Sequence, residues 1–86
     1  MWLIAHIDGS RIVTTVQSMA EAGAALRARR TEQGLSQAAV ARRAGVSREW
    51  LNEVENGKSR FDFQLYLAAC EALDLDVVVQ RRATDA

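Results

Sequence analysis

The sequence contains no proline, one cysteine and one histidine among its 86 residues. The single cysteine, Cys70, excludes an intramolecular disulfide, and together with His6 it supplies too few ligands for a metal site. Because Cys70 lies in the apolar run Leu65–Leu73, we expect a protein of a reducing compartment. No metal and no other cofactor is implied.

Long apolar runs are also missing. No run approaches the roughly 18 residues of a membrane span, and the opening Trp2–Ile7 is too short for a signal peptide. We therefore expect a cytoplasmic protein without membrane attachment. The residue patterns of catalytic sites are absent too. The single histidine lies on an expected strand, with no nucleophilic residue at a spacing typical of a catalytic site. No glycine-rich phosphate loop and no pair of catalytic carboxylates occurs in the sequence. The sequence predicts that the protein is not an enzyme.

The chain is small, half apolar and unevenly charged. Its 49% hydrophobic content predicts one globular domain, near the size at which a lone core is only marginally stabilising. The formal net charge is zero, yet residues 26–60 carry eight cationic and four acidic side chains, and the remainder carries three and seven. A basic middle with acidic flanks favours an anion-binding surface on one side, with a solvated face of mixed charge as the plain alternative.

The first part of the chain predicts a β-hairpin followed by a helix. β-branched and aromatic residues stand on both sides of Asp8–Ser10, a turn signal. Ser18 and Glu21 then fit a capping box at the start of a helix that runs to about Gln33. At 100° per residue, one face of this helix contains Met19, Ala22, Gly23 and Leu26.

Three more helices and a strand are expected. Ser36 and Ser47 are plausible N-caps for helices over 37–44 and 48–55, and Gly34 and Gly45 suit left-handed helix ends. Asp62 can cap a fourth helix that reaches residue 73, and residues 75–81 are typical of a strand. The expected fold is therefore mainly α, with a hairpin extension at 1–17, a four-helix domain at 18–74, and a dimerising strand and tail at 75–86.

The fourth helix is apolar around nearly its whole circumference, with only Gln64 and Glu71 as a polar strip. A helix of this kind must be buried on more than one side, and an 86-residue monomer has too little chain to surround it. We infer a homodimer. The residues expected at its interface are Leu67, Cys70, Leu75, Val77 and Val79.

Two charged residues, Arg30 and Glu55, fall on or at the edge of otherwise apolar helix faces. An unpaired charge in such a place is costly, so we predict that they form a structural ion pair with each other.

The segment from Leu35 to Gly57 contains two short helices around one glycine. Its spacing resembles the Cro/cI-type (XRE-type) helix-turn-helix family, whose pattern is Q-x3-A-x3-G-[VI]-S-x3-[ILV]-x3-E-x-G. The resemblance covers about residues 24–75 and implies a four-helix, lambda-repressor-like domain that binds double-stranded DNA. The matching residues are Gln37, Ala41, Gly45, Val46, Ser47, Leu51, Glu55 and Gly57.

The same resemblance implies which residues touch DNA. Gln37, Ser47, Lys58 and Arg60 would contact phosphates. Arg48 could form a bidentate pair with guanine, and Asn52 could do so with adenine. Three further candidates on the third helix are Glu49 and Glu53, which could accept from cytosine, and Trp50, for which packing at the edge of the core is the alternative.

The end of the chain, from Phe63 through Val79, is similar to HipB-like antitoxins, in which a fourth helix leads to a strand that pairs across a dimer. This resemblance implies an autoregulatory repressor on an inverted-repeat operator, with a HipA-like kinase toxin as partner. The alternatives are a free-standing XRE-type repressor and a protein-interaction module that no longer binds DNA.

Overall fold

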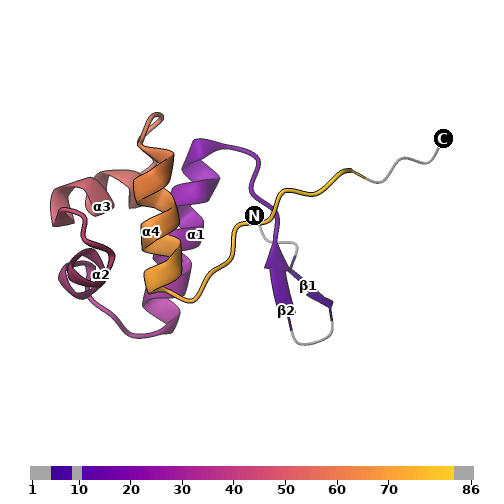
Figure 1. The fold of residues 1–86 in the computed structure, drawn as a ribbon, viewed down its shortest axis with the longest axis horizontal. Helices are drawn as coiled ribbons and strands as arrows, with labels where there is room; N and C mark the ends of the chain where they lie inside the picture. Colours follow the sequence, from indigo (N-terminus) through magenta and orange to yellow (C-terminus); the bar gives the residue numbers. More distant parts are fainter. Residues whose placement is uncertain (1–4, 9–10, 83–86) are drawn as a thin grey trace.

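The computed structural model describes residues 5–8 and 11–82, with the helices gathered at one end and a hairpin at the other (Figure 1). The hairpin pairs β1 (Ala5–Asp8) with β2 (Arg11–Thr14) in antiparallel register. The helices are α1 (Met19–Glu32), α2 (Gln37–Ala44), α3 (Arg48–Glu55) and α4 (Phe63–Ala72). The mainly α fold with an N-terminal hairpin is confirmed, although the predicted turn at Gly9 and Ser10 lies outside the described residues.

Each helix begins directly after the residue predicted to cap it. The hydroxyls of Ser18, Ser36 and Ser47 each accept a hydrogen bond from the backbone N–H three residues later, at 3.0 Å. The Asp62 carboxylate accepts from the N–H groups of Gln64 and Leu65 at 2.8 and 3.3 Å. These side chains satisfy donors that a helix start leaves free, which is worth about 1 kcal/mol per cap.

A residue with positive φ follows each helix, and it is a glycine in every case except after α4. Gly34 and Gly45 have φ values of 69° and 73°, as left-handed termini require. After α4 the left-handed residue is Asp74, with φ 58°, a conformation that aspartate tolerates better than most side chains. The Leu75 N–H then donates to the Cys70 carbonyl at 2.8 Å, and Leu75 packs against the core.

The core lies between the four helices. Its largest fully buried side chains are Leu26, Val40, Leu51, Val54 and Leu73. The Tyr66 hydroxyl donates to the Ala22 carbonyl at 2.9 Å, which ties α4 to α1. α1 and α3 approach each other closely at Gly23, where a Cβ atom would overlap the backbone carbonyl of Val54. No helix in the described part of the chain has the length and apolarity needed to cross a bilayer.

The strand expected at residues 75–81 is not formed in the single chain. Residues 75–82 belong to no helix or strand and run away from α4 (Figure 1). Among the described residues, no backbone group beyond Leu75 is hydrogen-bonded to another backbone group in this segment. A strand exists through hydrogen bonds to a neighbouring edge, and the single protomer provides none here. Val77, Val78 and Val79 consequently stand 43%, 60% and 96% exposed.

Candidate nucleic-acid interface

α2 and α3 form a two-helix unit joined at Gly45. The left-handed conformation of Gly45, φ 73° and ψ 31°, turns the chain sharply between them. The Val46 N–H donates to the Ala41 carbonyl at 3.0 Å and fixes the turn. Leu51 and Val54 are completely buried, so one face of α3 is held against the core. The opposite face of α3 is thereby presented to solvent in a fixed orientation.

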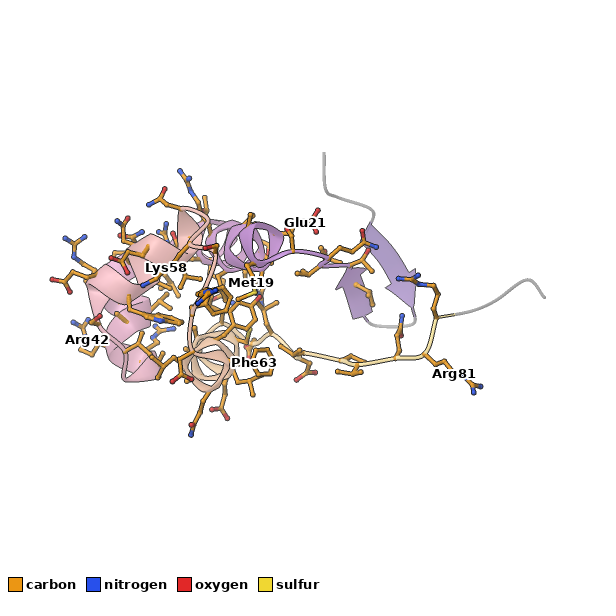
Figure 2. All side chains as sticks on the ribbon, turned by 90° about the horizontal axis from the view of Figure 1, so that it is seen from above. Met19, Glu21, Arg42, Lys58, Phe63 and Arg81 are labelled. Atoms are coloured by element: carbon orange, nitrogen blue, oxygen red, sulfur yellow. The ribbon has the colours of Figure 1, made fainter. Side chains whose placement is uncertain are left out.

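The outer face of α3 is polar. Of the residues predicted to read bases, Arg48, Glu49, Asn52 and Glu53 are all exposed. Within the described residues, the side chains of Arg48 and Glu49 make no hydrogen bond, so both are available to a ligand. Figure 2 shows Arg42 at the end of the molecule formed by α2 and α3, opposite the end that carries Arg81. The polar face of α3 is therefore exposed to solvent, at the end of the molecule opposite Arg81.

Asn52 lies at the centre of a small hydrogen-bond network on this surface. Its Oδ1 accepts from Gln37 Nε2 and from Asn56 Nδ2, both at 3.1 Å. Gln37 Nε2 also donates to Glu55 Oε1 at 3.1 Å. A bidentate contact from Asn52 to adenine would require its Oδ1 to give up these donors, while its Nδ2 group donates to no described residue and can donate to a base. Gln37, predicted as a phosphate contact, is here a link between α2 and α3.

The loop after α3 carries the other predicted phosphate contacts. Lys58 Nζ lies 3.0 Å from Glu53 Oε1, and both side chains are about half exposed. Arg60 is exposed in the same loop, and Ser47 is exposed at the start of α3. The ion pair between Lys58 and Glu53 reduces the repulsion that the Glu53 carboxylate alone would exert on a DNA backbone. Because this pair is exposed, it contributes little to stability.

Trp50 is half-buried, and its side chain packs against the core instead of extending into solvent. Its ring contacts Phe61 edge-on with centroids 6.2 Å apart, and Phe61 stacks on Tyr66 at 5.3 Å. Such pairs add about 0.5–1.5 kcal/mol beyond their buried area. The arrangement favours the packing alternative for Trp50 and fixes the loop between α3 and α4.

The predicted ion pair between Arg30 and Glu55 is confirmed. Arg30 Nε lies 2.7 Å from Glu55 Oε2, and Nη2 lies 2.8 Å from Oε1, so the pair is bidentate. The side chains are only 15% and 2% exposed. Arg30 Nη1 also donates to the Leu35 carbonyl at 2.9 Å, and the hydrogen bonds to Glu55 raise the pKa of Arg30. The pair joins α1 to α3 immediately behind the outer polar surface.

A second arginine has a structural role that the sequence did not indicate. Arg29 Nε and Gln33 Nε2 both donate to the Leu73 carbonyl, at 2.9 and 3.1 Å. Arg29 also pairs with Glu32 at 2.7 Å. The two donors satisfy a carbonyl at the end of α4. Because Leu73 is about 40 residues away in the chain, no local pattern could have identified this contact.

The residues predicted at a dimer interface differ in exposure. Leu67 is 42% exposed and Val77 and Val79 are exposed, whereas Leu75 packs partly against the core. Cys70 is only 3% exposed and packs inside the protomer, which leaves little of it for a second copy. Burial raises the pKa of the Cys70 thiol to about 11, so it is protonated at neutral pH.

In the described part of the chain, no group of three or more potential metal ligands occurs.

A family model described as a helix-turn-helix domain matches residues 21–83. The chain belongs to this helix-turn-helix family. The match covers α1 from Glu21 onward and all of α2, α3 and α4, with the Gly45 turn between α2 and α3. No curated protein sequence matches the chain at a significant level.

Solved structures extend the comparison of this helix-turn-helix protein. HipB in its complex with the O4 20mer matches with a TM-score of 0.75 at 15% identity, over 83% of this chain and all of HipB. The restriction-modification controller protein C.AhdI from Aeromonas hydrophila matches with a TM-score of 0.63 at 33% identity, over 67% of this chain and 88% of C.AhdI. ClgR from C. glutamicum, the clp gene regulator, has a TM-score of 0.63 at 29% identity, over 72% of this chain and 80% of ClgR. The fold is that of XRE-type helix-turn-helix regulators.

Proposed function

We propose that this helix-turn-helix protein is a non-enzymatic, sequence-specific transcriptional repressor that binds double-stranded DNA in the cytoplasm. The observation that carries the proposal is the exposed polar face of α3, held outward by the buried Leu51 and Val54. A helix fixed in this way can enter the major groove, where each base pair presents a distinct pattern of donors and acceptors.

Arg48 is the residue with which we expect α3 to discriminate bases. Its guanidinium is exposed at the first turn of the helix and is engaged by no carboxylate among the described residues. A guanidinium in the groove can donate two hydrogen bonds to O6 and N7 of guanine. Lys58, Arg60 and Ser47 would position the helix through phosphates without reading sequence.

Arg48→Ala is expected to weaken specific binding by about 1–3 kcal/mol and to relax base preference at one position of each half-site. The measurement is a mobility shift on the DNA upstream of the protein's own gene, at physiological salt with scrambled competitor. Arg27→Ala, which removes an exposed arginine of α1, serves as the matched control. An equal loss of affinity on every sequence would make Arg48 a phosphate contact instead.

A homodimer would place two copies of α3 in successive major grooves, about 34 Å apart, on an inverted-repeat operator. Exposed apolar side chains support this assembly. On α4, Phe63 and Leu67 are 57% and 42% exposed, and the three valines of the segment after α4 are exposed as well. A second copy would bury these side chains and supply the edge that residues 75–81 need to form a strand.

Val77→Asp is expected to shift the protein to monomers and to weaken operator binding, because a carboxylate would be buried against the partner. Leu67→Asp should act in the same way. Mass measured by sedimentation or light scattering checks both, with Gln64→Asp on the polar strip of α4 as the control that adds the same charge. Dimers of unchanged stability in both variants would contradict the proposed interface.

We further propose that the repressor is the antitoxin of a HipA-like kinase toxin and autoregulates its own operon. The supporting observation is the likeness to HipB over all of that chain, including HipB in a HipA-HipB-O2-O3 complex. Co-expression with a neighbouring kinase-like gene tests it: the two products should copurify, and the pair should shift the upstream DNA. Absence of a complex would favour the alternative of a free-standing regulator, to which the higher identities with C.AhdI and ClgR point.

A further inference from the structure

A shallow groove of about 680 Å³ lies between α4 and the segment that follows it. Leu67, Leu75 and Val77 contribute apolar surface, and Leu67 and Val77 are 42% and 43% exposed. Three carboxylates, from Glu71, Asp74 and Asp76, also line the groove. The groove therefore suits a ligand that is apolar along part of its length and cationic at one end.

The three carboxylates have no cationic partner in the described part of the chain. The ion pairs found there join Arg29 to Glu32, Arg30 to Glu55 and Lys58 to Glu53, none of which involves the groove. Glu71, Asp74 and Asp76 are all exposed. Their concentrated negative charge repels nucleic acid and leaves this surface for a cationic partner.

The chain itself carries two cations of the required kind at the end of the same segment. Arg81 and Arg82 are exposed and, among the described residues, make no ion pair. They follow the exposed run Val77–Val79, so apolar and cationic surface stand side by side. The segment runs away from α4, and Figure 2 shows Arg81 at the far end of the molecule. Neither arginine lines the groove of its own protomer.

We propose that the Arg81–Arg82 end of a second copy docks in the acidic groove beside α4 of the first, and that the contact is reciprocated. Two copies of one segment that pair across a two-fold axis perpendicular to it run antiparallel, so the acidic start of each meets the basic end of the other. A pair centred on Val78 sets Val77 opposite Val79 and Asp74 opposite Arg82. The three-valine run is buried in the middle, and opposite charges lie at both ends.

This inference rests on the proposed homodimer and adds the source of its orientation and specificity. The valines alone would pair equally well with any apolar strand, because the burial of apolar surface is not directional. The segment is acidic at its start and basic at its end, so antiparallel pairing of two copies sets the arginines of each against the aspartates of the other, and the two-fold axis duplicates every contact. The charges thus favour pairing with a second copy over pairing with unrelated apolar strands.

Charge reversal tests the contact in the full-length protein. We expect the double variant R81E/R82E to weaken dimerisation by roughly ten- to a hundredfold, since attraction becomes repulsion at both ends. The double variant E71R/D76R should weaken it similarly. Combining all four changes should return the dimer dissociation constant to within about threefold of the original value. Sedimentation equilibrium measures the constants, and circular dichroism checks that the helices remain.

The outcomes separate this contact from the wider proposal. An unchanged dissociation constant in R81E/R82E, or four combined changes that fail to restore association, would overturn the docking while leaving the dimer and its DNA binding intact. A monomeric parent protein would overturn the dimer itself. If E71R/D76R abolishes binding of another protein while R81E/R82E dimerises normally, the groove belongs to that partner and the inference is wrong.

Discussion

Gly23→Ala is expected to lower the free energy of unfolding by about 3 kcal/mol or more, at or beyond the upper end of the usual cost of overpacking. The added methyl group would overlap the Val54 carbonyl, and a backbone carbonyl of α3 cannot rotate aside as a side chain could. α1 and α3 would have to separate, and the core between them would lose contacts. For a domain of this size, the melting temperature should fall by roughly 12 °C or more.

Gly34→Ala provides the matched control for Gly23→Ala. Gly34 has φ 69°, and no described atom outside its chain neighbours lies within 4 Å of where the added methyl group would stand, so alanine there meets strain but no obstruction. A loss of only about 1 kcal/mol is expected. Thermal or urea unfolding of both variants measures the difference. If Gly23→Ala costs no more than Gly34→Ala, the close approach of α1 to α3 is not a constraint on the fold.

Glu55→Ala is expected to destabilise the protein by about 3–5 kcal/mol, because it leaves the guanidinium of Arg30 buried without its anion. Glu55 is 2% exposed on its side chain and holds Arg30 through two hydrogen bonds. It also accepts from Gln37, so Gln37 Nε2 loses one of its two acceptors. The loss would consume much of the stability of a small domain.

Glu53→Ala is the matched control for Glu55→Ala, since it removes a carboxylate from the same helix and breaks an exposed pair with Lys58. Its expected cost is at most about 1 kcal/mol. Urea unfolding at neutral pH compares the two. Equal effects would mean that the pair of Arg30 and Glu55 is solvated in solution. Replacing both partners of the buried pair with apolar residues should cost less than Glu55→Ala alone.

The buried pair is also connected to the surface that we propose to read DNA. Gln37 Nε2 donates both to Glu55 and to Asn52, so the position of the Asn52 amide depends on groups behind the outer face of α3. A variant at Gln37 would therefore release Asn52 Oδ1 from one of its two donors. The residues that we propose to select bases and those that support them form one network, which cannot be divided by inspecting exposed side chains alone.

Most helix boundaries could be predicted because their signals are local. Ser36, Ser47 and Asp62 stand next to the helices they cap, and Gly45 stands at the turn that needs its positive φ. The pairing of Arg30 with Glu55 was also predictable, since each charge falls on an otherwise apolar part of its helix and has only one suitable counterpart.

The strand at 75–81 was predicted from its valines and is not formed in the single chain. β-propensity describes how well a segment suits a sheet, but only a neighbouring edge can complete its hydrogen bonds. The same limit applies to Cys70. Its apolar surroundings indicated burial, yet they did not distinguish burial inside the protomer from burial between two copies.

The order of amino acids is enough to establish where each helix begins and ends, which face of α3 is polar, and that an arginine and a glutamate must meet. These features depend on residues within about four positions of each other, or on a charge that burial forces to find its opposite. Three other contacts follow only from the packed fold: Gly23 touches Val54, Arg29 holds Leu73, and Asn52 is tied to Gln37. Those contacts join residues 15 to 44 positions apart, and they exist only once the packing of the helices has set the distance between their backbones.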